Sequence, residues 1–431
     1  MKLLRLEDEF LRNAGLMSLG LGLFNVFNLL YHLFMIRALS PVDYGLLNTL
    51  TAFFMLITVP ASTVQTTITK FVTSFQTKSQ YFQTRSFLRH FLLLMVTVAS
   101  SLLILIALGS AFISSFFQIA SRGLIILTGI ILFFAMVTPV AGGGLQGLQK
   151  FGSMALTLFV NGGLKLILGI FFVVLGWGLL GAMGAIALAY FVTASLSLFL
   201  LYFSLKTQWE KVCLKKDFTA DGSWHVSEAY RYFFPVGLTL LCFMVLTNID
   251  LILVKHFFTP IEAGYYSISQ MVGKIILFLP LPIVTVMFPK VFVMEIKKRK
   301  TTPVLIWSLM VAGCACILAI GMCHLFPELI LRLITGKDYR ECIPLIKFFS
   351  INMTFFSLTL ILLYYQLALN EREFLYPLPF LTLIQSGLIL LFHKTLVQVL
   401  IVVTLVAFSL LVINFYLVYR PRKSNGRERS V

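Results

Sequence analysis

The chain has 431 residues, of which 59% are hydrophobic and only 12% charged, and its mean hydropathy is +0.95. A water-soluble protein of this length cannot cover so much apolar surface, so the composition predicts a protein that lies in a lipid bilayer. The formal net charge of +17 does not indicate nucleic-acid binding, because the basic residues lie in short gaps between apolar segments and not among aromatic residues in one soluble region.

Twelve apolar segments are long enough to cross a bilayer as helices, so we expect an all-α polytopic membrane protein. They lie at about 13–36, 47–69, 91–113, 124–145, 154–175, 179–203, 232–254, 265–292, 304–327, 344–369, 374–392 and 396–418. A polar stretch separates the first six from the last six. We therefore expect an N-terminal six-helix lobe at 1–205, a cytoplasmic linker at 206–230, a C-terminal six-helix lobe at 231–419 and a basic cytoplasmic tail at 420–431.

One seven-residue turn motif occurs in each half of the chain. Residues 39–45 read LSPVDYG and residues 258–264 read FTPIEAG, and the two prolines are 219 residues apart. A hydroxyl residue, a proline and an acid in this order end one helix and cap the next. Chance recurrence is the alternative, but the same offset also aligns the flanking apolar segments. The counterparts that we single out are Pro41, Asp43 and Gly45 in the first half, and Pro260, Glu262 and Gly264 in the second.

An even number of spans in each half gives both halves the same orientation, so we expect a parallel repeat about an axis along the membrane normal. The distribution of the 34 lysines and arginines predicts which side the termini face. Three lie inside predicted spans (Lys165, Lys274, Lys347), and seven lie on the side opposite the termini (Arg37, Arg122, Lys255, Arg332, Lys337, Arg340, Lys394). The other 24 lie on the terminal side, so both termini are expected in the cytoplasm.

The motifs of both halves resemble those of the polysaccharide or oligosaccharide flippase families. The resemblance lies in the LSPVDYG turn, in LQGLQKF at 145–151, and in Pro235, Asn248-Ile249-Asp250 and Gly264-Tyr265-Tyr266. These families belong to the multidrug/oligosaccharidyl-lipid/polysaccharide exporter superfamily, which also contains multidrug extruders and lipid II flippases. The resemblance covers nearly the whole chain in segment order. It implies two six-helix lobes, a central cavity and alternating access for a polyprenyl-phosphate-linked sugar.

Lys165 and Lys274 are predicted near the middle of their spans, where a lysine costs at least about 2.5–3.5 kcal/mol. Such a lysine should face the protein interior, and two cations without a mid-depth acid suit a phosphate. We therefore expect a substrate site that contains Lys274, Lys165, Asn25, Asn28, Gln65 and Gln270. The alternatives are lysines bonded to backbone carbonyls at a kink, and amides that only join helices.

Asp250 is the only acid that we place inside a span, near its outer end. It is a candidate site for a coupling ion, but we favour the alternative that it pairs with Lys255. No paired carboxylates, metal-ligand spacing or glycine-rich phosphate loop indicates an enzyme, and we expect no cofactor and no metal.

We therefore expect a flippase of the cytoplasmic (inner) membrane that moves a lipid-linked oligosaccharide for surface polysaccharide synthesis. Its expected partners are that substrate, membrane lipids and other polysaccharide-assembly proteins, but no nucleic acid. One alternative is a multidrug cation antiporter of the same superfamily, which the mid-span lysines disfavour because acids attract cations. Another is a membrane glycosyltransferase or polymerase, for which the polar segment Glu328 to Ile343 is the longest candidate region on the outer side.

Overall fold

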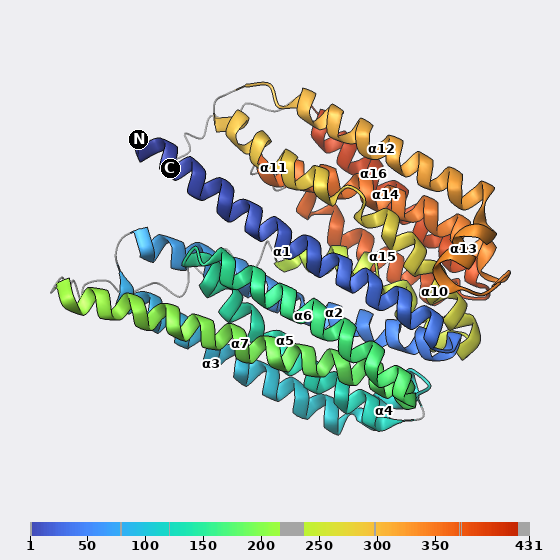
Figure 1. The fold of residues 1–431 in the computed structure, drawn as a ribbon. Helices are drawn as coiled ribbons and strands as arrows, with labels where there is room; N and C mark the ends of the chain where they lie inside the picture. The colour runs from blue at the N-terminus through green and yellow to red at the C-terminus, as the bar shows by residue number, and fades with distance from the viewer. Residues whose placement is uncertain are drawn as a thin grey trace. The chain divides into compact units, whose positions relative to one another are not determined.

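The structure is a computed structural model that describes residues 2–77, 80–119, 121–215, 237–296, 299–369, 371 and 373–420. These residues form helices and no strand, so the expected all-α fold is confirmed (Figure 1). The first helices are α1 (Lys2–Ala38), α2 (Pro41–Thr77), α3 (Tyr81–Leu108), α4 (Ser110–Phe116), α5 (Arg122–Gly147), α6 (Phe151–Phe172) and α7 (Gly178–Lys215). Gly237–Leu246 is also helical. The others are α9 (Ile249–Phe257), α10 (Pro260–Phe278), α11 (Leu281–Ile296), α12 (Thr302–Leu325), α13 (Pro327–Thr335), α14 (Cys342–Ala368), α15 (Pro377–Leu391) and α16 (Leu396–Tyr419).

Ten helical stretches of the described chain are long and apolar enough to span a membrane, and the bent pair Gly237–Leu246 and Ile249–Phe257 makes eleven. One of the ten, Phe151–Thr207, has 57 residues and would extend about 85 Å as a single helix, nearly three times the hydrocarbon thickness. It is broken between α6 and α7, where Gly176 and Gly178 have φ of 88° and 51°. Counting α6 and α7 separately gives twelve spans, as the hydropathy predicts.

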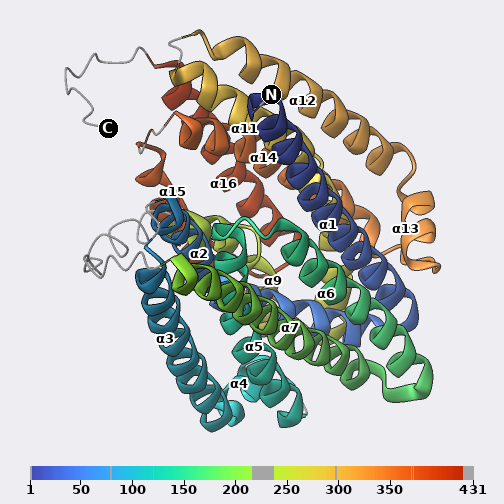
Figure 2. The same cartoon turned by 60° about the vertical axis from the view of Figure 1, so that its left-hand side comes forward.

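The described residues form two compact units. One contains Met1–Ile268 with Arg332–Asp338, and the other contains Ser269–Leu331 with Tyr339–Val431. In the first unit α5 is central and packs against α2, α3 and α7, while α1 lies along α6 (Figures 1 and 2). In the second unit α14 is central and packs against α11, α12 and α16. The helix α5 is the fourth span of its half, and α14 is the fourth span of the other half. In both units the central fourth span packs against the second, third and sixth spans of the same half.

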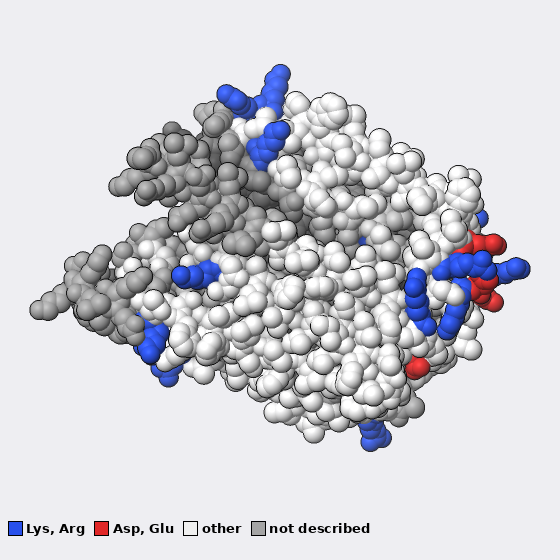
Figure 3. All heavy atoms as spheres, in the orientation of Figure 1, with Lys and Arg blue, Asp and Glu red and all other residues white. Residues whose placement is uncertain are grey.

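The surface of the described residues follows the lipid environment. In Figure 3 the lysines, arginines and acids lie toward the ends of the helices, and the surface between them is almost free of charge. Large apolar side chains such as Leu105, Ile167, Leu318 and Leu383 are exposed. Apolar residues on both the inner and outer faces of a helix are expected where the surrounding solvent is lipid.

Two predicted spans are broken where single residues compete with helical hydrogen bonding. The span expected at 232–254 bends by 43° after Leu246. There the side chains of Thr247 and Asn248 donate to the carbonyls of Phe243 and Met244, and local bonds of this kind weaken a helix. The span expected at 265–292 is also broken, since α10 ends at Phe278 and α11 begins at Leu281. Pro280 causes the break because it has no backbone N–H to donate and because it disfavours a helical conformation of the residue before it.

Two glycines allow α5 to pack closely against α2. A Cβ on Gly143 would lie 2.7 Å from the carbonyl oxygen of Gln65, and one on Gly147 would lie 2.6 Å from the Cβ of Val72. The two glycines are four residues apart and so lie on one face of α5, an arrangement that favours close contact between helices in membranes. Thr69 and Thr73 of α2 donate to the carbonyls of these glycines at 3.4 Å. This packing gives the first unit its centre.

We predict that Gly147→Ala lowers the thermal stability of the purified protein, because the added methyl group overlaps Val72 and overpacking costs about 1–3 kcal/mol. Unfolding temperature in detergent measures the effect. Gly22→Ala is the matched control, since a Cβ on Gly22 would meet no atom within 4 Å. Equal unfolding temperatures for the two variants would contradict the proposed role of Gly147.

Candidate functional site

Lys165 is buried in the middle of α6, with 9% of its surface exposed. Its Nζ donates a hydrogen bond of 2.9 Å to Oδ1 of Asn28 in α1, and it lies 4.3 Å from the centre of the Tyr31 ring. Both neighbours are electrically neutral, and a ring face attracts a cation through its quadrupole. The lysine site (Asn28, Tyr31, Lys165) thus forms where α1 packs along α6.

Tyr31 is fixed by contacts on both of its ends. Its hydroxyl donates to the carbonyl oxygen of Ala182 in α7 at 3.0 Å, and none of its surface is exposed. A Cβ on Gly169 would lie 2.7 Å from the Tyr31 ring, so only glycine leaves room for the ring at this place. One turn before Lys165, Asn161 donates to Thr193 of α7 at 3.1 Å. The lysine site is therefore held from α1, α6 and α7.

Among the described residues, no carboxylate forms an ion pair with Lys165. An ammonium group has three N–H donors, and the amide of Asn28 takes one of them. A buried charge that only neutral groups solvate is costly compared with one that has a counter-ion. This arrangement is chemically suited to an anion.

The structure brings only some of the predicted substrate residues together. Asn28 contacts Lys165, whereas Asn25 is exposed, and Gln65 is half-buried beside α5. Gln270 is fully buried and Lys274 half-buried, and both belong to the second unit. The sequence reasoning missed Tyr31, although it follows Asn28 by three residues and so lies on the same helix face.

Asp250 is buried in α9 and accepts a hydrogen bond of 2.7 Å from the hydroxyl of Tyr266 in α10. Lys255 is only 2% exposed. The carboxylate of Asp250 is therefore hydrogen-bonded within the protein at the start of α9.

Both copies of the repeated turn cap the helix that follows them. In the first, the Ser40 hydroxyl donates to the Asp43 carboxylate at 2.7 Å and accepts from the Asp43 backbone N–H at 3.1 Å. In the second, the Thr259 hydroxyl and backbone N–H both donate to Glu262 Oε2, at 2.7 and 3.0 Å. The Glu262 N–H donates back to the Thr259 hydroxyl at 3.4 Å, which completes a capping box. Pro41 and Pro260 are the first residues of α2 and α10.

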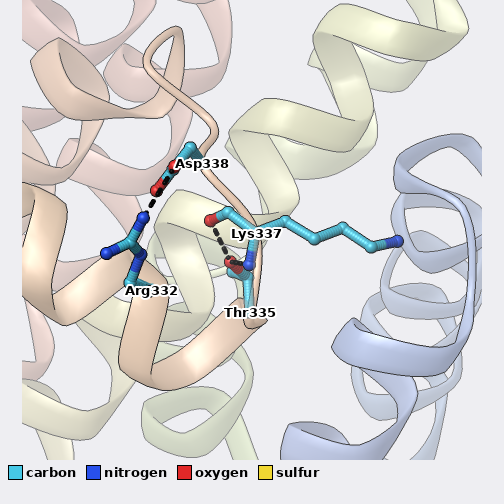
Figure 4. A network of polar contacts seen from close by, with 4 residues as sticks. All are labelled: Arg332, Thr335, Lys337 and Asp338. Atoms are coloured by element: carbon cyan, nitrogen blue, oxygen red, sulfur yellow. Dashed lines mark hydrogen bonds and ion pairs between the residues drawn. The ribbon is translucent and has the colours of Figure 1, made fainter.

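The segment Arg332–Asp338 packs with the first unit, although the chain on both sides of it belongs to the second. Arg37, in the last turn of α1, donates to the carbonyls of Leu333 and Ile334, the latter at 3.1 Å. These carbonyls lie at the end of α13, where helical bonding leaves them unsatisfied. Arg332 pairs with Asp338 at 3.2 Å, and Thr335 and Lys337 bond to each other (Figure 4). These contacts form a structured turn within Glu328 to Ile343, the segment that the sequence analysis gave as the candidate region for a glycosyltransferase or polymerase.

The described residues thus form many spans in two units with matching internal packing, which is an arrangement also found in membrane proteins built from internal repeats. Residues 10–295 match the polysaccharide biosynthesis protein family, and the chain belongs to that family. The expected relationship to a family of polysaccharide-related membrane proteins is confirmed by this match. The chain is thus a multi-pass membrane protein of that family.

Relatives of known structure share the fold along almost the whole chain. A multidrug resistance MATE family transporter in an inward-facing conformation has a TM-score of 0.76 at 15% identity, over 93% of this chain and 97% of the other. The lipid II flippase MurJ has a TM-score of 0.70 at 12% identity, over 94% and 87%. A MOP superfamily transporter from Pyrococcus furiosus has a TM-score of 0.62 at 17% identity, over 95% of this chain and 94% of the other. The binding pocket of that transporter has reverse polarity.

A relative by sequence is an uncharacterised membrane protein of Methanocaldococcus jannaschii. It is 28% identical over 149 residues, which are 34% of this chain and 36% of that protein. The match therefore spans about a third of the relative's length.

We predict that Thr259→Ala lowers stability by about 0.5–2 kcal/mol, the usual cost of losing an N-cap. Urea or thermal unfolding of the purified protein measures it. Glu262→Gln is the comparison variant, because glutamine also completes a capping box and should preserve most of the stability. A larger loss in Glu262→Gln than in Thr259→Ala would show that the negative charge, and not the cap, stabilises this turn.

Proposed function

We propose that the protein moves a polyprenyl-phosphate-linked oligosaccharide across the cytoplasmic membrane for surface polysaccharide synthesis. The observation that carries the proposal is the lysine site, where Lys165 is buried among neutral groups at mid-span. A phosphate or pyrophosphate on the carrier lipid supplies the counter-charge that these residues lack.

The proposal also meets the physical requirements for moving a lipid-linked sugar across a bilayer. A charged, hydroxyl-rich head group must cross about 30 Å of hydrocarbon, whereas a polyprenyl tail is already soluble in lipid. Lysine binds phosphate as a compact point charge on a flexible stem. In the resting protein the Tyr31 ring and Asn28 amide solvate the ammonium group, and the lipid phosphate replaces part of that solvation when it arrives. Lys274, with Gln270 one turn before it, is proposed as a second contact.

The alternative is a multidrug cation antiporter, and the fold shared with a multidrug transporter favours it. The charges favour the flippase. A cation site needs acids that face the substrate, but Asp250 accepts from Tyr266, and Asp43 and Glu262 cap helices. The buried charge at mid-span in the first unit is a cation, which repels a cationic drug.

The proposed orientation puts both termini in the cytoplasm, because 24 of the 34 basic residues lie on that side in the twelve-span topology. The proposed domains are the lobes at 1–205 and 231–419, joined by a linker at 206–230 and followed by a tail at 420–431. Glycosyltransferases and other polysaccharide-assembly proteins are the partners that this function requires.

We predict that Lys165→Gln lowers export of the lipid-linked sugar about 10- to 150-fold at matched protein levels. A hydrogen bond to a charged group contributes about 1.5–3 kcal/mol, and 1.4 kcal/mol corresponds to a factor of ten. Lys165→Arg should restore most of the export, because it keeps the charge. Exposed Lys206→Gln is the control, and the same pair of substitutions tests Lys274. Near-normal export in Lys165→Gln would remove this lysine from the mechanism.

We also predict that the C-terminus lies in the cytoplasm. A reporter enzyme that works only in the cytoplasm should therefore be active when fused after Val431, and a reporter that works only outside the cell should be inactive. A pair of fusions, one to a cytoplasmic and one to an externally active reporter, measures the location directly. Activity of the external reporter alone would reverse the orientation and, with it, the direction of transport.

A further inference from the structure

The helix α13 (Pro327–Thr335) is too short to cross a membrane. Its nine residues extend about 14 Å, whereas the hydrocarbon core of a bilayer is about 30 Å thick. It does not continue α12, because Phe326 has φ of −129° and ψ of 48°, and a residue before a proline disfavours the helical conformation. Figures 1 and 2 show α13 directly beyond the end of α12. A short helix thus begins where a long apolar one ends.

One face of α13 packs against the rest of the described chain, and the opposite face is apolar and exposed. Leu331, Ile334 and Thr335 are buried and form the packed face. Leu329 and Leu333 are four residues apart and therefore lie side by side. They are 61% and 70% exposed, and we call them the leucine row. Because Leu333 follows Leu331 by two residues, the leucine row points away from the packed face.

A third face of α13 is charged. Glu328 and Arg332 are also four residues apart, and both are exposed. Arg332 pairs with Asp338 in the turn that follows the helix. In Figure 3 lysines, arginines and acids gather on the side where Figure 1 labels α13. Because charged side chains are costly in hydrocarbon, this face indicates that α13 lies at the edge of the bilayer.

The leucine row continues the exposed apolar surface of α12. Leu318, Met322 and Leu325 of α12 are exposed at spacings of four and three residues, so they share one face. The helix α12 is long and apolar enough to be a membrane span, so lipid is the solvent of this face. Leu325 is the last residue of α12, and the leucine row begins four residues later. Lipid that covers the end of α12 therefore also reaches α13.

Arg37 fixes the C-terminal end of α13. It donates to the carbonyls of Leu333 and Ile334, the latter at 3.1 Å. In the turn after the helix, the Thr335 hydroxyl donates to the carbonyl of Lys337 and accepts from its N–H, at 2.9 and 3.1 Å. With its end held, α13 cannot roll about its own axis. The leucine row and the charged face therefore keep their directions.

We propose that α13 is an interfacial helix that binds the surface of the bilayer. The leucine row inserts among the acyl chains, while Glu328 and Arg332 remain among head groups and water. Amphipathic helices that lie in the membrane plane divide their faces in this way. In the proposed orientation the surface is the outer leaflet, because α13 follows the ninth span. The binding itself does not depend on the substrate that the protein moves.

The first experiment measures how far lipid shields the leucine row. Leu333→Cys and Arg332→Cys are compared, because these neighbours are almost equally exposed in the protein, at 70% for Leu333 and 71% for the Arg332 side chain. The purified proteins are placed in dioleoylphosphatidylcholine vesicles with a water-soluble maleimide on both sides of the membrane. Arg332→Cys should react about tenfold faster, since a thiol among acyl chains stays protonated and the thiolate is the reactive form. Equal rates would overturn the proposal.

Two further proteins serve as references for this measurement. Leu318→Cys, on the exposed face of α12, gives the rate of a thiol that faces lipid. The unsubstituted protein, in which Cys314 is exposed, gives the background. After denaturation Leu333→Cys and Arg332→Cys should react equally, which shows that both thiols are intact. Because the substituted side chains are exposed, the variants should keep the unfolding temperature of the unsubstituted protein.

The second experiment tests direct contact with acyl chains. A small fluorophore is attached to the new cysteine before the protein is placed in vesicles. When brominated phosphatidylcholine replaces dioleoylphosphatidylcholine, the fluorescence at Leu333→Cys should fall as strongly as at Leu318→Cys, and much less at Arg332→Cys. Bromine quenches a fluorophore only on close approach. An unquenched Leu333→Cys would mean that a protein surface, such as a second copy of this chain, covers the leucine row, and it would reject lipid as the occupant.

Labelling in whole cells separates lipid from a cellular partner. If Leu333→Cys reacts slowly in cells but quickly in vesicles of the purified protein, a partner covers α13 and the proposal fails. Slow reaction in both supports it. Neither experiment measures transport, so a chain that exports no lipid-linked sugar can still have a lipid-bound α13. The interfacial helix and the proposed function therefore fail separately.

Discussion

The close approach of the α2 and α10 backbones at Gly45 and Gly264 joins the two copies of the repeated turn, because a Cβ on either glycine would overlap the other copy. It exists because each helix begins at a fixed residue. Ser40 and Asp43 fix the start of α2, and Thr259 and Glu262 fix the start of α10. With both starts fixed, the glycines fall opposite each other and Asn48 falls opposite Ser267. A cap that satisfies backbone N–H groups thus also sets the register of two helices that are far apart in the chain.

The number and approximate ends of the spans followed from hydropathy, because lipid accepts only segments whose backbone bonds are internal. Which helices pack against each other could not be predicted from hydropathy, because a helix that is apolar on every face does not show which face contacts the protein. The break after Leu246 was missed because it depends on side-chain bonds of Thr247 and Asn248 inside an apolar segment. The short helix α13 was missed because its nine residues are too few to cross a membrane, so hydropathy over the length of a span does not detect it. Tyr31 was missed because a tyrosine in a span usually indicates only packing.

The lysine site shows how the first unit holds a cation without an acid. A carboxylate beside Lys165 would satisfy it permanently and compete with any anionic ligand, whereas an amide oxygen and a ring face give weaker and replaceable contacts. The site is rigid, because Tyr31 is fixed by Ala182 and by the space at Gly169. Such a site loses little conformational freedom when a ligand binds.

The Asn48–Ser267 hydrogen bond has a consequence for any protein built from two linked copies. In a dimer of identical chains, a residue on the symmetry axis faces itself, so one residue type must serve as donor and acceptor to its own copy. A single continuous chain is free of that restriction. Here an amide donor stands on α2 and a hydroxyl acceptor stands at the equivalent position of α10. A single chain with two repeats can thus be chemically asymmetric where the repeats meet, and each side can be altered without altering the other.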